Sequence, residues 1–302
     1  MKSERLAYLL IGLAVIGTFL FLASTTSQLT PQNPVRNATS KATGPASGKT
    51  MVFSDDFYGS GLSQQKWSTC YDWRKSTETG CTNEGNLEQQ WYTASQLSVQ
   101  NGSLVITASK EPVDVAVQGQ ARSFMYKSGM INSGSGTAGS NKAHWTGTYG
   151  YFEARMKVQK GQGVWPAFWL LPANGQWPPE IDVMEFLGSK PGQVLQTVHW
   201  KEDGKHLKSD SVVNKNSDYS ATWHTYGVDW EPGQIDWYID GVKTRSFIGS
   251  DVPSTPMEVI VNLAIGGLLP GNADGSTPFP RQLAVDYVRV FQTNDQIRPT
   301  TN

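Results

Sequence analysis

Cysteine is scarce in this chain, which holds two copies, Cys70 and Cys81. A lone pair cannot supply the four ligands of a structural zinc site, and no cluster of histidines stands beside it to complete one. Two cysteines this close in sequence can instead close a loop as a disulfide in an oxidising compartment. We therefore expect a Cys70–Cys81 disulfide rather than a metal site or a catalytic thiol.

The chain also lacks an excess of charge of either sign. It carries 25 basic and 26 acidic residues, and its formal net charge is -1. Proteins that bind nucleic acids neutralise phosphates with a basic surface, so this balance argues against nucleic acid as a partner. Glycine and tryptophan are instead numerous, at 30 and 11 copies. That composition is typical of a β-rich extracellular protein, and indole rings can stack on sugars.

A long apolar run occurs only near the N-terminus, where residues 6–23, interrupted only by Gly and one Thr, follow Lys2 and Arg5. The run is about 18 residues, long for the apolar part of a signal peptide and short for a spanning helix. No clean A-x-A cleavage site follows it. Residues 1–27 are therefore predicted to be a signal peptide or an N-terminal membrane anchor. Either would place the protein outside the cell, secreted or tethered to the outer face of the membrane.

Composition divides the rest of the chain into three parts. Residues 28–50 are rich in Ser, Thr, Pro, Asn and Gly, cannot bury enough apolar surface to offset their ordering entropy, and are predicted to be a disordered linker. Residues 51–293 are predicted to form one domain without internal repeats, and residues 294–302 a C-terminal tail. We expect this domain to be a monomer.

Short runs of alternating apolar and polar residues predict β-strands in that domain. The clearest is a hairpin in which residues 97–99 and 103–107 flank the turn Asn101-Gly102. The same period of two recurs in four further segments: 150–158, 233–241, 257–264 and 284–290. Because no segment has a convincing helical period, the pattern predicts an all-β fold in which two antiparallel sheets pack as a sandwich.

One predicted strand has the sequence EIDVME, which begins at Glu180. Glu180 and Asp182 share a face, because side chains alternate along a strand. Glu185 stands at an odd spacing from Glu180, so a regular strand would bury it against the other sheet. A β-bulge at Val183-Met184 would insert one extra residue and return Glu185 to the face of the other acids. We therefore predict a bulged strand with three acids in a row.

Such a row suits glycoside hydrolysis. Like charges held close together raise the pKa of a carboxyl group, as a general acid requires. Retaining glycosidases hold two carboxylates about 5–5.5 Å apart, one to attack the anomeric carbon and one to protonate the leaving oxygen. The alternative is an exposed edge strand decorated with acids. The flanks 164–172 and 186–188 are strongly apolar, which favours a central strand and hence a catalytic row.

At these residues the chain resembles the family sixteen glycoside hydrolases, the laminarinase and lichenase clan of the concanavalin-like jelly-roll fold. Five segments extend the resemblance in the family's order: YGYFEAR at 149–155, GVWPAFW at 163–169, WHTY at 223–226, NLAIGG at 262–267 and DYVRV at 286–290. The resemblance implies that residues 51–293 form a glycoside hydrolase catalytic domain, a β-jelly-roll sandwich of two antiparallel sheets with an open substrate cleft. It also implies that catalysis needs no cofactor.

The resemblance assigns roles to the acids. It implies that Glu180 is the nucleophile, that Glu185 is the acid/base, and that Asp182 between them tunes protonation. The extra residue Met184 resembles the bulged subgroup, which includes endo-1,3-β-glucanases, agarases and carrageenases. We therefore expect a retaining endo-β-glycanase that hydrolyses 1,3-β-linked polysaccharide of the laminarin type. The alternatives are a hydrolase of galactan, agar or mixed-linkage glucan, a wall-remodelling transglycosylase, and a non-catalytic glycan-binding protein.

Other residues are predicted to bind the substrate by the same resemblance. Trp165 and Trp169 would approach the cleft, although either could be a core aromatic. Arg155 matches a cleft arginine of the family, and its alternative is an ordinary surface arginine. His199 corresponds to a histidine near the acid/base, and its alternative is a structural role.

The stretch 85–92, GNLEQQWY, resembles a sugar-binding signature and makes Asn86 and Glu88 candidates. The sequence departs from the family at 266–271, GGLLPG, where many laminarinases carry a tryptophan before the proline. This departure bears on the substrate more than on the chemistry. Family members often bind a structural Ca²⁺ near the domain ends, so Asp56 and Asp286 are candidate ligands, with metal-free aspartates as the alternative.

Overall fold

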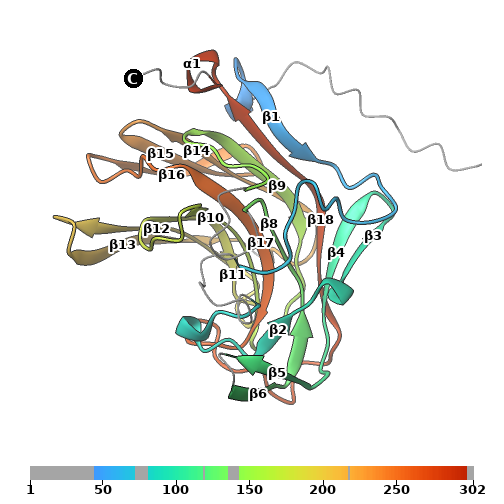
Figure 1. Cartoon of the computed structure of the whole chain (residues 1–302). Coiled ribbons are helices and arrows are strands. Elements are labelled where there is room, and N and C mark those ends of the chain that lie inside the picture. Colours follow the sequence, from blue (N-terminus) through green and yellow to red (C-terminus); the bar gives the residue numbers. More distant parts are fainter. Residues whose placement is uncertain (1–43, 72–80, 118–119, 135–142, 217, 298–302) are drawn as a thin grey trace, which may run out of the picture. The chain divides into compact units, whose positions relative to one another are not determined.

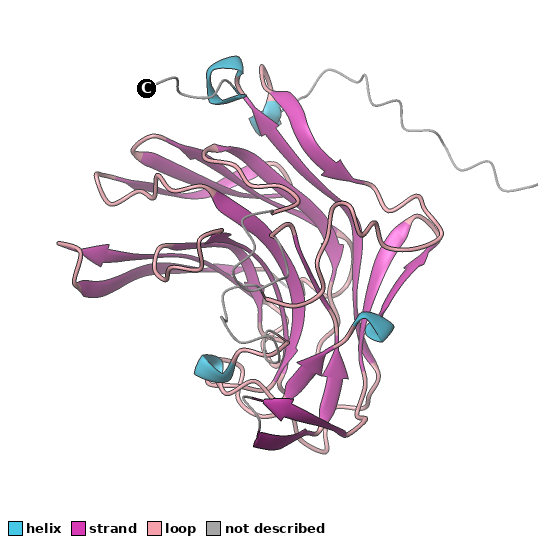
Figure 2. Cartoon of the chain, in the orientation of Figure 1, coloured by secondary structure: helices cyan, strands magenta, loops and turns pink. Residues whose placement is uncertain are grey.

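The computed structural model describes residues 44–71, 81–117, 120–134, 143–216 and 218–297, and these residues form two stacked β-sheets (Figure 1, Figure 2). The described residues contain four short helical segments: η1 (Gly44–Ala46), η2 (Glu84–Asn86), η3 (Ala94–Gln96) and α1 (Asn294–Ile297). None of these helices is long or apolar enough to cross a membrane. The prediction of an all-β fold is confirmed.

The larger sheet is antiparallel and has eight strands. Its order is β16-β15-β14-β9-β18-β4-β3, and β1 pairs with β18 beyond the end of β4. The bounds of its strands are β1 (Thr50–Asp55), β3 (Leu97–Gln100), β4 (Ser103–Ala108), β9 (Gly150–Lys157), β14 (His224–Glu231), β15 (Gln234–Ile239), β16 (Val242–Ile248) and β18 (Arg281–Gln292).

The smaller sheet is also antiparallel and has six strands in the order β13-β12-β11-β10-β17-β8. Its strands are β8 (Met130–Asn132), β10 (Val164–Pro172), β11 (Glu180–Phe186), β12 (Gln193–Glu202), β13 (His206–Lys215) and β17 (Met257–Ile265). Two small pairs complete the described strands: β2 (Gln90–Tyr92) with β7 (Tyr126–Ser128), and β5 (Val113–Val117) with β6 (Gln120–Phe124). The strand that carries the acid row, β11, is central in its sheet, as its apolar flanks predict.

The core lies between the two sheets, and most of their strands contribute side chains to it. In β9, Phe152, Ala154 and Met156 are fully buried in this core. Glu153 and Arg155 alternate with them and therefore face the other side of the sheet. The period of two in the sequence thus sets which side chains of β9 join the two sheets.

The predicted hairpin forms, and a second hairpin has the same kind of turn. Asn101 and Gly102 join β3 to β4 with φ angles of 51° and 73°. Asp240 and Gly241 join β15 to β16 with φ angles of 52° and 76°. Positive φ at both central residues gives the turn whose twist matches the flanking strands, and Asn-Gly and Asp-Gly favour it.

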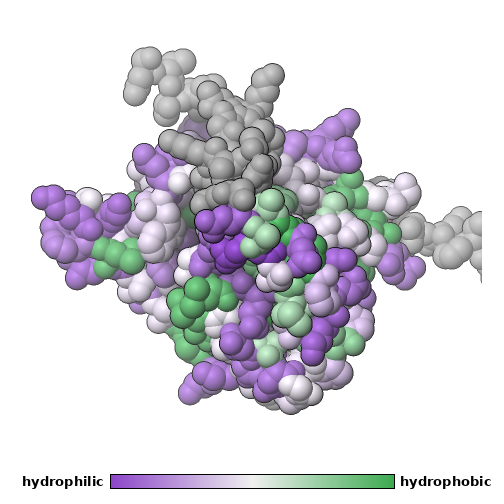
Figure 3. Space-filling model, turned by 60° about the horizontal axis from the view of Figure 1, so that its bottom comes forward, coloured by the Kyte–Doolittle hydropathy of each residue, from purple (hydrophilic) through white to green (hydrophobic). Residues whose placement is uncertain are grey.

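In the view of Figure 3, hydrophilic residues predominate and apolar residues form small separate groups. The exposed apolar side chains include Leu87, Leu268 and Leu269, which are 63%, 70% and 42% exposed. A main-chain hydrogen bond from Leu268 to Asn86 joins the two loops that carry them. The exposed Leu268 and Leu269 therefore precede Pro270, where many laminarinases carry a tryptophan.

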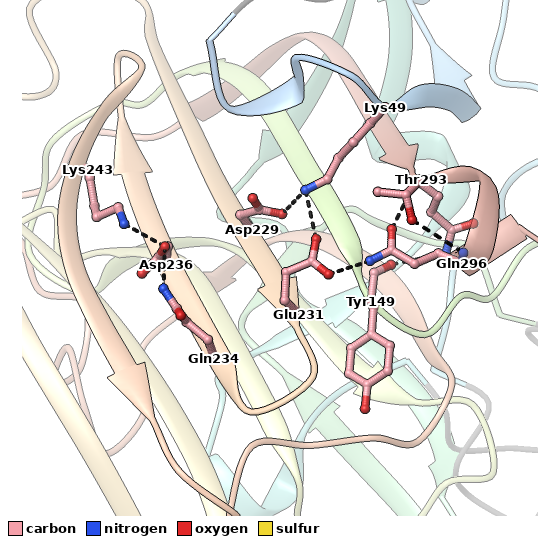
Figure 4. A network of polar contacts seen from close by, with 10 residues as sticks. Lys49, Tyr149, Asp229, Glu231, Gln234, Asp236, Lys243, Thr293 and Gln296 are labelled. Carbon is pink, nitrogen blue, oxygen red and sulfur yellow. Dashed lines mark hydrogen bonds and ion pairs between the residues drawn. The ribbon is translucent and has the colours of Figure 1, made fainter.

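Both ends of the described chain are bonded to β14 (Figure 4). The Lys49 ammonium lies 2.5 Å from Asp229 and 2.9 Å from Glu231. Gln296 in α1 donates to the second carboxylate oxygen of Glu231 at 2.6 Å. The Lys49 side chain is 8% exposed, so this ion pair is shielded from water more than a surface pair is. Glu231 thus connects the two ends of the domain.

These contacts change the predicted boundaries of the domain. Residues 44–50, which the sequence assigns to the linker, contain η1 and the start of β1. Residues 294–297, assigned to the tail, form α1. The predicted signal peptide or anchor and the linker up to residue 43 lie outside the described residues.

Candidate active site

The acid row lies on β11, and this strand is bulged against both of its neighbours. Asp182 pairs with Thr197 and Glu185 with Leu195, so three steps along β11 face two steps along β12. The register against β10 shifts at the same place. The extra residue falls at Val183-Met184, and the predicted β-bulge is confirmed.

The bulge sorts the side chains of β11 onto two faces. The apolar side chains are fully buried and belong to the core between the sheets: Ile181, Val183, Met184 and Phe186. Glu180, Asp182 and Glu185 all line a cleft of about 610 Å³ on the other face of the sheet. The odd spacing between the two glutamates is therefore compatible with their lying on one wall.

Each acid has a neighbour that contacts its carboxyl group. Trp177 donates its indole N–H to Oε2 of Glu180 at 2.5 Å. Nε2 of His199 lies 3.3 Å from Oδ2 of Asp182. The third acid, Glu185, accepts a hydrogen bond of 3.2 Å at Oε1 from the indole of Trp165.

The three carboxyl groups are buried and lie close to one another, and both conditions oppose their ionising together. Burial, and next the charge of Glu180, raise the pKa of Glu185 to about 7. Burial, and next the charge of Asp182, raise the pKa of Glu180 well above its usual range. Burial and the charge of Glu185 likewise raise the pKa of Asp182. The row therefore retains protons at a pH where isolated carboxyl groups would have lost them.

The predicted tryptophans stand in the cleft, where the resemblance places them, whereas His199 faces Glu180 and lies next to Asp182 instead of the proposed acid/base Glu185. Trp165, Trp169 and His199 all line the cleft. Trp169 donates its indole N–H to Oδ1 of Asn262 at 2.8 Å, so it is both packed and fixed in orientation. His199 faces Glu180 directly across the β11–β12 ladder.

Asn86 and Glu88 line the same cleft at the end of η2. The Glu88 carboxylate accepts hydrogen bonds from Gln90 at 2.6 Å and from Tyr92 at 3.2 Å. Burial raises the pKa of Glu88 to about 7, although these hydrogen bonds and one from Asn86 favour its charged form.

The predicted disulfide between Cys70 and Cys81 is present and adjoins this wall. Tyr71, next to Cys70, lines the cleft. Its ring packs edge to face against Trp169, with centroids 6.1 Å apart. The disulfide thus anchors the chain segment that places Tyr71 over Trp169.

The prediction that Arg155 lies in the cleft is wrong. Arg155 belongs to β9, in the eight-stranded sheet, and it alternates with residues of the core. Its guanidinium pairs with Asp286 at 2.7 Å and lies over the Trp223 ring, 5.0 Å from the centroid. The local pattern places Arg155 on the outer face of its strand, and the cleft is formed by the other sheet.

The candidate calcium ligands also have other partners. Asp56 accepts hydrogen bonds from Arg289, at 3.0 Å from Nε and 2.5 Å from the second guanidinium nitrogen. Asp286 accepts from Arg155. A guanidinium held against each carboxylate repels a cation, so these contacts give the calcium prediction no support. Among the described residues, the cluster of metal-ligand types is Glu180, Asp182 and His199, within the acid row itself.

The sequence did not single out several residues of the cleft. Trp177 is 49% exposed and donates a hydrogen bond to Glu180. It stands three residues before Glu180, in a Pro-rich loop. Asn262 and Thr197 line the cleft from β17 and β12. Proximity to the acid motif could have indicated Trp177, and membership of the NLAIGG segment could have indicated Asn262.

The chain is similar to β-glucan-cleaving proteins. Residues 85–289 match the glycosyl hydrolases family 16. An endo-1,3-1,4-beta-glycanase of Rhizobium meliloti is 39% identical over 261 residues, which cover 80% of this chain and 51% of that protein. A beta-glucanase of Rhodothermus marinus is 33% identical, over 80% of this chain and 85% of that protein. The chain thus spans about half the length of the first curated relatives that it matches.

The similar solved structures also include β-glucan-cleaving proteins. The endo-beta-1,3-glucanase of Pyrococcus furiosus is 30% identical with a TM-score of 0.64, covering 81% of this chain and 94% of that one. The laminarinase catalytic domain of Thermotoga maritima is 28% identical with a TM-score of 0.66, covering 81% and 98%. The predicted jelly-roll sandwich is confirmed, and the chain belongs to the glycosyl hydrolases family 16.

Proposed function

We propose that the chain is a retaining endo-β-glycanase that hydrolyses 1,3-β-linked glucan of the laminarin type. The observation that carries this proposal is the bulge in β11, which puts Glu180 and Glu185 on one wall of the cleft with Asp182 between them. Two carboxyl groups on one wall can act on the same glycosidic bond, one as nucleophile and one as acid.

In the first step, Glu180 attacks the anomeric carbon and Glu185 protonates the leaving oxygen. A pKa of about 7 keeps most of the Glu185 carboxyl groups protonated below neutral pH. Glu180 must be charged to attack, and the Trp177 N–H stabilises that charge. Glu180 and Asp182 share a hydrogen bond that raises the pKa of Glu180 and lowers that of Asp182, so the shared proton must leave Glu180 before Glu180 attacks.

In the second step, the ester on Glu180 is hydrolysed by water that Glu185 deprotonates. The negative charge of Glu180, which helps to raise the pKa of Glu185, disappears when the ester forms. Glu185 therefore becomes a stronger acid and stays ionised, ready to act as a base. The same residue serves both steps because its partner changes charge between them.

The relatives support a 1,3-β-glucan as substrate. A protein named as a glucan endo-1,3-beta-glucosidase from Niallia circulans is 32% identical over 277 residues, and the similar solved structures include laminarinases. A second candidate is glycan with both 1,3- and 1,4-linkages. The endo-1,3-1,4-beta-glycanase of Rhizobium meliloti favours it, since it is 39% identical.

We also propose that the protein works outside the cell. The apolar run at 6–23 supports export, and so does the disulfide between Cys70 and Cys81, since such bonds persist in oxidising compartments. Fractionating cells that express the full chain, and sequencing the N-terminus of the product, would distinguish a cleaved signal from an uncleaved anchor. Recovery from the cytosol with an intact N-terminus would refute export.

The test of activity uses the full chain with laminarin, lichenan, agarose and xyloglucan, and sizes the products over time. We expect oligosaccharides of several lengths from laminarin, released with the β-configuration at the new reducing end by NMR. Glu180→Ala and Glu185→Ala should each lower kcat by roughly a thousandfold or more while the protein stays folded. Near-normal turnover by either variant, or release from xyloglucan alone, would refute the proposal.

A further inference from the structure

The bulge in β11 leaves two main-chain carbonyl groups that accept hydrogen bonds from side chains inside the core. The carbonyl oxygen of Asp182 accepts from the indole N–H of Trp237 at 2.9 Å. The carbonyl oxygen of Val183, the next residue, accepts from the amide of Gln196 at 3.3 Å. Trp237 comes from the opposite sheet, on β15, and Gln196 from the neighbouring strand β12. Both donors are fully buried.

We infer that Trp237 and Gln196 are positioning residues, which hold the β11 bulge from behind and so keep Glu185 on the same wall as Glu180. This inference rests on the proposed function, because it assigns the bulge a part in catalysis. It goes beyond that function, because neither residue lines the cleft.

The physical reason lies in how a bulge is stabilised. A bulge disrupts the ladder locally, and a buried carbonyl without a donor destabilises the fold. Trp237 and Gln196 supply donors at the two positions that begin the bulge. A regular strand would carry Glu185 into the core, where an unpaired carboxyl group is costly. The two donors therefore favour the register that the site requires.

The donors are themselves held in place. The side-chain oxygen of Gln196 accepts hydrogen bonds from Thr244 at 2.6 Å and from Asn214 at 2.8 Å. Arg245 lies over the Trp237 ring, 4.4 Å from its centroid, and donates to the main-chain oxygen of Gln196 at 2.8 Å. Thr244 and Arg245 are neighbours on β16, so one edge strand orients both donors.

The test compares two tryptophans of the same core. Trp237→Phe removes the donor to Asp182 and keeps most of the ring. Trp230→Phe is the matched control, because Trp230 is also fully buried and donates to a carbonyl, that of Pro253, at 2.8 Å. Both variants lose one buried hydrogen bond, so both should lose similar stability. Only Trp237→Phe removes a bond from the bulge.

For Trp237→Phe we expect kcat on laminarin to fall roughly tenfold to a hundredfold, with KM within about twofold of the wild type. The alkaline limb of the pH profile of kcat/KM should move to lower pH, because the charge of Glu180 raises the pKa of a displaced Glu185 less. For Trp230→Phe, kcat and the pH of the alkaline limb should both match those of the wild type. The inference is overturned if Trp237→Phe behaves as wild type, or if both variants lose activity equally.

Thr244→Val is the variant to test in its place if Trp237→Phe does not fold. It removes the hydroxyl that bonds Gln196 and leaves the ring of Trp237, and we expect a smaller change of the same kind. Crystal structures of the wild type and a folded variant separate this inference from the proposed function. If the wild type does not hydrolyse any glucan, the function fails. A variant that retains the wild-type bulge and Glu185 position overturns the inference whatever the activity.

Discussion

The indole N–H of Trp165 lies 3.2 Å from Oε1 of Glu185, so a hydrogen bond joins the proposed acid/base to the neighbouring strand. This bond favours the ionised carboxylate. Burial and the charge of Glu180 act the other way and are larger, because the pKa of Glu185 is raised to about 7. Trp165 therefore limits how far the pKa of the acid rises, and a change at this position should appear in the pH dependence.

Trp165→Phe should raise the pKa of Glu185 above its present value, because the variant loses the donor that stabilises the carboxylate. Glu185 acts in its protonated form in the first step, so the alkaline limb of kcat/KM should move to higher pH. Measuring initial rates on laminarin across the pH range tests this. Trp169→Phe is the control, because Trp169 donates to Asn262 and not to an acid. A limb that stays in place or moves to lower pH would contradict the prediction.

Glu88→Gln should make the protein more stable at neutral and alkaline pH. The folded state raises the pKa of Glu88 from 4.5 to about 7. Below about 4.5 the group is protonated in both states and has no effect; between 4.5 and 7 the unfolded chain loses its proton first, so stability falls as pH rises. The loss reaches about 3 kcal/mol above pH 7.

Urea unfolding of wild type and Glu88→Gln at several pH values checks this prediction. The free energy of unfolding of the variant should decline less between pH 4 and 8, by up to about 3 kcal/mol. Glu111→Gln, at an exposed glutamate that pairs with Lys127, is the matched control and should leave the pH dependence unchanged. Parallel curves for wild type and Glu88→Gln would show that Glu88 titrates normally in the folded protein.

Replacing Cys70 and Cys81 together with serine should lower the free energy of unfolding by about 3 kcal/mol, since the disulfide closes a short loop. The KM for laminarin should also rise, because the bond anchors the segment that holds Tyr71 against Trp169. Thermal unfolding and steady-state kinetics measure the two effects. Wild type treated with a reductant should reproduce both. An unchanged KM in the double variant would show that the cleft wall does not need the bond.

The sequence was sufficient to predict the acid row and its backbone. The spacing from Glu180 to Glu185 is odd, so the period of two along a regular strand would put them on opposite faces. Two catalytic acids, however, must share a face. A bulge was the simplest conformation that satisfied both conditions, and it occurs at Val183-Met184. Local rules were enough here because the conflict and its resolution lie within one strand.

The sequence was insufficient wherever the sheet assignment or a distant partner decides the result. The pattern of β9 shows that Arg155 points away from the core, but it does not show which sheet β9 joins. The same limit applies to Trp237, whose partner Asp182 lies on another sheet. Trp177 was missed for a different reason: it lies in a loop, where no period indicates the direction of a side chain.

Glu231 also determines where this domain can be cut and joined. It accepts from Lys49 at one end of the described chain and from Gln296 at the other, so both ends leave the domain from one place on β14. Neither end borders the cleft. A circular permutant that links residue 297 to residue 44 and opens the chain at the exposed Asp240-Gly241 turn should therefore keep its catalytic wall intact.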